Sequence, residues 1–353
     1  MMKGRPEVLQ QTILQLRALL LFLLVVLILL PVVLLFGDTI FNSIKQEWAT
    51  RFNPVEIPEP TAGAKYWSPP YLDSVTDAKR KAQLEYGREL VTHTALYLGP
   101  KGSIKPISNG MNCQNCHPEA GTKVFGNNFS AVAVTYPRFR ARSNSIEDIY
   151  KRVNDCFVRS LNGQPLDTAS QEMQAIKAYI LFLGSNVEPK TIPEGSGLKD
   201  LPYLKREADP VKGKIIFEEK CMRCHQFNGE GQLAPNGMEY TYPPLWGNHS
   251  FNDAAGLYRI SPFARYVKYN MPQGVIHSFP LLSDEEAWDV AAFVLSQPRP
   301  HKEMPKDWPD ISKKPVDYPF GPFSDGFSAH QHKFGPFEPI LEAQKNMTTK
   351  ARQ

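Results

Sequence analysis

The sequence predicts a mainly α-helical protein with two similar domains in tandem behind one N-terminal transmembrane helix, followed by a long extended C-terminal tail. Three observations predict this arrangement. An uncharged apolar run lies near the N-terminus, a C-x-x-C-H motif occurs twice, and helical patterns surround both motifs in the same order. At 353 residues the chain is long enough for two small domains and additional segments.

The overall composition is that of an ordinary globular protein. Hydrophobic residues make up 42% of the sequence and charged residues 22%, which argues against disorder and against a polytopic membrane protein. The net charge is only +4, and no long block of lysine and arginine occurs. We therefore expect no nucleic-acid partner.

The N-terminal apolar run covers residues 18–36 and contains no charged residue. As a helix it would rise by about 28 Å, close to the ~30 Å thickness of a hydrocarbon core. A signal peptide is the alternative, but its apolar region normally spans about 7–15 residues. Lys3, Arg5 and Arg17 precede the run, which predicts that the N-terminus stays in the cytoplasm. We expect a single-pass anchor in a bacterial inner membrane, with the rest of the chain on the periplasmic side.

Four of the five cysteines belong to the two C-x-x-C-H motifs. The two cysteines of each motif lie about one helical turn apart, where their thiols can form thioethers to the vinyl groups of a haem. The adjacent histidine then becomes the proximal iron ligand. A redox dithiol or half a zinc site could explain an isolated C-x-x-C, but the histidine in both copies speaks against it. We predict two covalently bound haem c groups. The attachment residues are Cys113, Cys116 and His117 in the first motif and Cys221, Cys224 and His225 in the second.

The surroundings of the motifs repeat, which predicts two class I cytochrome c folds in tandem. The expected helices open at residue 86 and cover 145–154 and 171–184 in the first half, and cover 213–221, 263–270 and 283–296 in the second. A capping box at Ser283–Glu286 should begin the last of them. The predicted divisions are a cytoplasmic N-terminus (1–17), the anchor (18–36), a linker (37–75), domain 1 with the active site (76–190), a linker with domain 2 (191–297), and a tail rich in proline and aromatic residues (298–353).

Each half offers a candidate for the sixth iron ligand. In the second half it is Met271, which lies on a loop between two helices, although a core methionine is the alternative. The first half has Cys156 at the corresponding position of the repeat. Such a cysteine is ordinarily a small buried hydrophobe. Here Arg152 and Arg159 flank it at helical distances, and nearby positive charge favours a thiolate.

Five arginines lie within about twenty residues of Cys156. Any one of them alone is more often solvated surface charge. As a set they predict an anion pocket, because guanidinium groups offer paired N–H donors that match oxyanions such as sulfonate. A small dianion with a terminal sulfur could then reach Cys156 or the iron. The five are Arg138, Arg140, Arg142, Arg152 and Arg159.

Several runs of the sequence resemble the dihaem thiosulfate dehydrogenases, from about Trp67 to about Ile340. The run RVNDCFVRSLNG, which contains Cys156, is the most specific. The other runs are GMNCQNCH, EMQAIKAYI, KYNMP, YPPLWG and QHKFGPFEPI. Asn270 stands directly before Met271, where some relatives have a lysine, which puts ligand switching at the second haem in doubt.

The resemblance implies His/Cys ligation of the first haem and His/Met ligation of the second. It also implies an active site at the first haem, where Arg142, Arg152 and Ser160 hold the substrate. The implied reaction converts two thiosulfate ions into tetrathionate and two electrons, or runs in reverse, with Cys156 as a carrier of sulfur. The second haem would pass the electrons to a cytochrome or a membrane oxidase complex.

Two other functions remain open from the sequence. A non-catalytic, membrane-anchored electron-transfer subunit with two haems is favoured by the anchor, whereas the arginine cluster counts against it. A dihaem peroxidase would need a haem with an open distal position, but both halves offer a sixth ligand.

Overall fold

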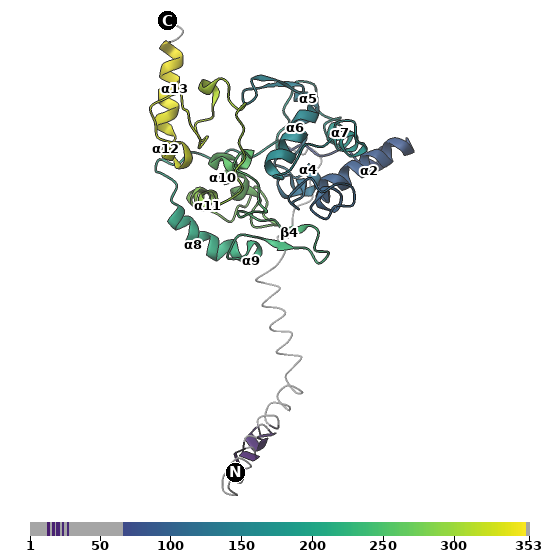
Figure 1. Ribbon diagram of the computed structural model, residues 1–353, viewed down its shortest axis with the longest axis vertical. Helices are drawn as coiled ribbons and strands as arrows, with labels where there is room; N and C mark the ends of the chain where they lie inside the picture. Colours follow the sequence, from purple (N-terminus) through teal and green to yellow (C-terminus); the bar gives the residue numbers. More distant parts are fainter. Residues whose placement is uncertain are drawn as a thin grey trace. The chain divides into compact units, whose positions relative to one another are not determined.

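The computed structural model describes residues 66–350, with side chains up to residue 346, and ten positions between residues 13 and 27. The chain divides into two compact units, residues 1–63 and residues 64–353. The larger unit contains both C-x-x-C-H motifs and is mainly helical (Figure 1). This agrees with the predicted fold class for the part that carries the haem motifs.

The predicted membrane anchor, residues 18–36, lies mostly outside the described residues. The positions that are described there are helical, and their leucine side chains are exposed. Within the described parts of the chain, no helix is both long and apolar enough to span a membrane. The anchor therefore stays a prediction from the sequence.

The first half of the larger unit is built around two helices, α2 and α7, that cross at a glycine. Its helices are α2 (Ala78–Thr92), α3 (Thr94–Leu98), α4 (Pro118–Gly121), α5 (Val132–Thr135), α6 (Ile149–Asp155) and α7 (Gln171–Leu183), with short 3₁₀ turns at Leu72–Ser74 and Cys113–Asn115. Ser170 begins α7 by accepting a hydrogen bond from the backbone N–H of Met173. At the crossing, a Cβ on Gly87 would lie 2.1 Å from the carbonyl oxygen of Ala175. Only glycine permits this close approach.

The second half repeats this crossing between α8 and α11. Its elements are α8 (Pro210–Lys220), α9 (Met222–His225), the 3₁₀ turn Gly256–Tyr258, α10 (Ile260–Asn270) and α11 (Asp284–Ser296). A Cβ on Gly213 of α8 would lie 1.9 Å from the carbonyl oxygen of Asp289 on α11. The capping box predicted at Ser283 and Glu286 begins α11 and is confirmed. The shared helix crossing places the two motifs in equivalent surroundings.

Two short antiparallel hairpins accompany the helices, and the first corrects a prediction. The helix expected over residues 145–154 begins only at Ile149, because Asp148 caps it by accepting from the N–H of Lys151. The preceding residues pair instead as a strand. The strands are β1 (Arg138–Arg140) with β2 (Ser145–Glu147), and β3 (Gln232–Leu233) with β4 (Tyr240–Tyr242).

The C-terminal tail returns over both halves and is not extended throughout. A 3₁₀ turn at Ile311–Lys313 is followed by α12 (Ala329–Phe334) and α13 (Glu338–Lys350), so the expectation of a wholly extended tail is wrong. Ser328 begins α12 by accepting from the N–H of Gln331, a capping signal that the composition of the tail conceals. Phe337 packs on Tyr203 and Trp288, with ring centroids 5.3 and 5.9 Å apart. Figure 1 shows α12 and α13 at the edge of the unit that contains α10 and α11.

Candidate active site

The first C-x-x-C-H motif and Cys156 line one cavity of about 330 Å³. Cys113 begins a 3₁₀ turn that follows Asn112, Cys116 comes directly after this turn, and His117 comes directly before α4. Arg152 and Ser160 line the same cavity. Most of its remaining wall is apolar, from residues such as Val91, Phe129, Val132, Ile149, Ile176 and Ile180. An apolar cavity with two thiols and a histidine at one wall suits a covalently attached haem.

The histidines of both motifs are held in the form that an iron ligand requires. The Nδ1 of His117 lies 2.5 Å from the carbonyl oxygen of Asn127, and the Nδ1 of His225 lies 2.8 Å from that of Pro243. With Nδ1–H donating to a carbonyl, Nε2 keeps its lone pair for a metal. Burial lowers the pKa of His117 to about 4 and also lowers that of His225. Both imidazoles are therefore neutral near pH 7, and the residues present fit a haem in each half.

Around the second motif, the structure places the ligand candidates at the end of α10. Met271 directly follows this helix, is half-buried, and packs against the hydrophobic core. Asn270 is 2% exposed, and its Nδ2 donates to the carbonyl oxygen of Phe125 in the first half, at 3.1 Å. Lys268 is buried with its Nζ 2.8 Å from a carboxylate oxygen of Asp284. Its ammonium group is therefore engaged by the start of α11. The assignment of Met271 as a ligand stays a prediction.

Cys156 begins a π-helical turn, Cys156–Ser160, that continues α6. Its carbonyl oxygen accepts from the N–H of Leu161 at 2.9 Å, five residues later. The turn forms the C-terminal end of this helix, where π turns occur commonly. Asn252 of the second half stabilises this turn, because its Nδ2 donates to the carbonyl oxygen of Val158 at 2.9 Å. The half-buried Cys156 is thus presented to the cavity by a turn that both halves support.

The five arginines near Cys156 separate into two groups. Arg138, Arg140 and Arg152 line the cavity, and none of their guanidinium groups has a hydrogen bond or an ion pair among the described residues. The charge of Cys156 is the main cause that raises the pKa of Arg152. Arg152 and Cys156 thus lie close enough to interact electrostatically.

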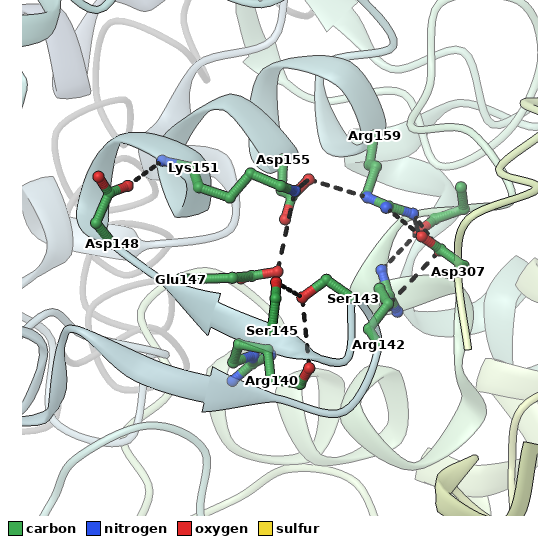
Figure 2. Close-up of polar contacts among 11 residues, drawn as sticks. Arg140, Arg142, Ser143, Ser145, Glu147, Asp148, Lys151, Asp155, Arg159 and Asp307 are labelled. Atoms are coloured by element: carbon green, nitrogen blue, oxygen red, sulfur yellow. Dashed lines mark hydrogen bonds and ion pairs between the residues drawn. The ribbon is translucent and has the colours of Figure 1, made fainter. Parts of the chain in front are cut away.

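Arg142 and Arg159 are instead bound to Asp307 of the C-terminal tail (Figure 2). Arg159 donates from both Nη atoms to the two carboxylate oxygens of Asp307, each at 2.7 Å. The Nη1 of Arg142 donates to the carbonyl oxygen of Ala254 at 3.1 Å, and its Nε lies 3.9 Å from Asp307. Burial lowers the pKa of Arg142 to about 10. Of the predicted substrate residues, Arg152 and Ser160 thus share the cavity with Cys156, whereas Arg142 does not line it.

Two residues of this region were not predicted from the sequence. Asn252 holds the π turn, and Asp307 pairs with the arginines, although neither belongs to a recognisable motif. Asp307 is 148 positions from Arg159 in the chain. No spacing pattern connects residues at that separation, so only the fold could reveal the contact.

Each half of the larger unit matches a different family model. Residues 104–187 match the model of the SoxA/TsdA cytochrome c domain, and residues 210–298 match the cytochrome c model. Both matches agree with the two predicted cytochrome c domains.

Three thiosulfate dehydrogenases illustrate the similarity to whole proteins. That of Allochromatium vinosum is 39% identical over 203 residues, which cover 56% of this chain and 73% of the relative. That of Psychrobacter arcticus is 36% identical over 242 residues, covering 68% of this chain and 71% of the relative. That of Stutzerimonas stutzeri is 34% identical over 239 residues, which cover 68% of this chain and 75% of the relative.

A solved structure gives the same result. The thiosulfate dehydrogenase (TsdBA) of Marichromatium purpuratum superposes with a TM-score of 0.62 at 26% identity, over 71% of this chain. The chain spans about half of the length of that protein, 53%. The resemblance, the two haem c groups and the oxidoreductase class predicted from the sequence are thereby confirmed. The chain belongs to the dihaem thiosulfate dehydrogenase family, as an oxidoreductase of this type with two covalently bound haem c groups.

Proposed function

We propose that the chain oxidises thiosulfate to tetrathionate at the cavity that contains Cys156, and that the second haem passes the electrons to an acceptor. One observation carries the proposal: Cys156 shares its cavity with a C-x-x-C-H motif and with Arg152, a cation that has no partner among the described residues. A nucleophilic sulfur, a redox centre and an anion-binding group are thus within one cavity. The reverse reaction would use the same groups.

The cofactors are held by the residues of the two motifs. Cys113 and Cys116 would form the thioethers of the first haem, and His117 would ligate its iron. Cys221, Cys224 and His225 would do the same for the second haem, and Met271 would also ligate its iron. The two bound haems supply two one-electron acceptors, which equals the number of electrons that the reaction releases.

The proposed chemistry proceeds through a disulfide-like adduct on Cys156. The Cys156 thiolate and one thiosulfate form Cys156–S–S–SO₃⁻ and release two electrons, with a new bond between Sγ and the terminal sulfur of thiosulfate. The terminal sulfur of a second thiosulfate attacks the sulfur bonded to Sγ. Tetrathionate leaves and the thiolate is restored. Neither step transfers a proton, and the absence of Asp and Glu from the residues that line the cavity suits this scheme.

Arg152 and Ser160 hold the first thiosulfate in this proposal. The guanidinium of Arg152 binds the sulfonate oxygens by charge-assisted hydrogen bonds, and the hydroxyl of Ser160 donates one more. The family resemblance assigns Arg142 to the substrate as well. Its contacts with Asp307 and Ala254 favour a different role, in which Arg142 holds β1 and the tail in place.

The predicted anchor determines where this reaction would occur. The apolar run at 18–36 would tether the haem domains to the periplasmic face of a bacterial inner membrane. An electron-accepting cytochrome or a membrane oxidase complex would then lie within reach. The same anchor favours the alternative function, a non-catalytic electron-transfer subunit.

The Cys156→Met variant tests the proposed function. Methionine can still ligate iron, so the fold and both haems should survive, whereas a thioether cannot form the adduct. Thiosulfate oxidation with ferricyanide as acceptor should therefore collapse, while pyridine haemochrome still gives two haems per chain. Full activity in this variant would contradict the mechanism. If the unmodified protein were inactive with thiosulfate but exchanged electrons rapidly with an oxidase, the electron-transfer function would replace it.

A further inference from the structure

The hairpin of β1 and β2 directs two arginines into the cavity that contains Cys156. Side chains alternate along a strand, so Arg138 and Arg140 share one face of β1 and Phe139 occupies the other. Both arginines line the cavity, whereas Phe139 is 50% exposed. Arg138 is exposed and Arg140 is half-buried, which places the pair where the cavity meets solvent.

Neither guanidinium is neutralised by a residue that the structure describes. Among the described residues neither has an ion pair or a side-chain hydrogen bond, and no Asp or Glu lines the cavity. Glu147 is the cross-strand neighbour of Arg138, but its carboxylate is buried 3.9 Å from the Nζ of Lys151. Asp307 is engaged by Arg142 and Arg159, and Figure 2 shows the Arg140 side chain turned away from it. Since Arg152 belongs to the wall as well, three arginines of this cavity have no ion pair or side-chain hydrogen bond within the part of the chain that the structure describes.

The proposed reaction needs more than one cation. It brings a second thiosulfate dianion to an adduct that already carries a sulfonate, and like charges repel strongly at such distances. Arg152, beside Cys156, serves the first sulfonate. Arg138 and Arg140 line the same cavity and reach solvent, so a second anion that enters past them would meet their guanidinium groups.

We propose that Arg138 and Arg140 form a second anion subsite, which binds the attacking thiosulfate or the outer sulfonate of tetrathionate. This inference rests on the proposed function and adds the place of the second substrate. The guanidinium groups offer paired N–H donors to the sulfonate oxygens and leave the terminal sulfur free to attack. The same donors would also suit the carboxylates of a haem, and the experiment separates these two anions.

The test isolates the second half-reaction. The adduct is loaded on the oxidised holoprotein with excess tetrathionate, which exchanges one thiosulfate for the Cys156 sulfur without net oxidation. After removal of the excess, discharge of the adduct by added thiosulfate is followed by intact-mass spectrometry. In the Arg138→Gln/Arg140→Gln variant, the second-order rate constant of discharge should fall about tenfold to hundredfold, the range of one or two charge-assisted hydrogen bonds.

Two controls make the result specific. Discharge by dithiothreitol, whose attacking thiolate carries no sulfonate group, should be nearly unchanged in the variant, because the arginines have no oxyanion to bind. An Arg80→Gln/Lys105→Gln variant loses the same net charge at exposed positions outside the cavity. Its discharge by thiosulfate should match the unmodified protein, since distant exposed charges are screened.

The possible results separate this inference from the proposed function. Unchanged discharge by thiosulfate in the Arg138/Arg140 variant would overturn the second subsite, and so would equal slowing with dithiothreitol. A shifted haem midpoint potential with unchanged discharge would assign the arginines to haem carboxylates. If the unmodified protein formed no adduct at all, the proposed function itself would fail.

Discussion

The buried carboxylate of Asp307 should contribute strongly to stability, and the Asp307→Asn variant measures that contribution. The side chains of Arg159 and Asp307 are only 5% and 9% exposed, and their two hydrogen bonds are both 2.7 Å long. Removal of one partner from a buried ion pair leaves an uncompensated charge and typically costs about 3–5 kcal/mol. Asp155 lies 3.6 Å from the Nε of Arg159 and retains part of the counter-charge. We therefore expect the free energy of unfolding to fall by an amount near the lower end of this range, about 3 kcal/mol.

Thermal melting of the holoprotein checks this value. A loss of about 3 kcal/mol corresponds to a fall in Tm of roughly 6–12 °C for domains of this size. Asp200→Asn is the matched control, because its carboxylate is 91% exposed and lies 3.1 Å from Arg265. That surface pair should contribute less than about 1 kcal/mol.

The double variant Arg159→Met/Asp307→Leu distinguishes the loss of the pair from the cost of a buried lone charge. Arg159 and Asp307 are then both removed, and only Arg142, whose Nε lies 3.9 Å from Asp307, loses its counter-charge. The double variant should therefore regain part of the stability that Asp307→Asn loses. If the Tm of Asp307→Asn lies within about 2 °C of that of the unmodified protein, the difference in stability is less than about 1 kcal/mol, and the buried pair does not have the predicted role. A double variant that is less stable than Asp307→Asn would contradict this role as well.

Three further predictions concern the haems, the membrane and a buried carboxylate. Pyridine haemochrome should give two haems per chain, and one after Cys113→Ala/Cys116→Ala; a single haem in the unmodified protein would contradict the tandem domains. The protein should stay with membranes after a high-salt wash and retain its N-terminus, whereas a soluble chain that begins near residue 40 would indicate a signal peptide. Burial alone would raise the pKa of Glu239, but hydrogen bonds from His93, Asn112 and Asn236 outweigh burial and hold it below the ordinary value of 4.5. Its ionised form therefore stabilises the fold above that pH, and this contribution is lost as the pH falls through the lowered folded-state pKa. Glu239→Gln should unfold in urea about 1–2 kcal/mol more easily at pH 7, and an equal deficit at about pH 3 would contradict the assignment.

Some features of the site follow from the sequence because their chemistry depends on local spacing. The C-x-x-C-H motifs require only five consecutive residues, and they correctly indicated two haem c groups. The capping box at Ser283 and the closing helices follow from near neighbours in the same way. Cys156 stood out by its place in the repeat and by its flanking arginines, and the structure does bring it into the cavity with Arg152 and Ser160.

Pairing between distant residues was decided only by the tertiary structure. From their spacing alone, all five arginines near Cys156 were candidates for an anion site, and the family resemblance singled out Arg142 and Arg152. The fold binds Arg142 and Arg159 to Asp307 and leaves Arg138, Arg140 and Arg152 facing the cavity. Likewise, the helix expected from residue 145 gave way to a hairpin, because β1 offered a partner strand. The sequence alone determined which chemical groups the protein has and how local segments fold. The tertiary structure determined which charges are neutralised, because a buried counter-ion is supplied by packing between segments that no local pattern connects.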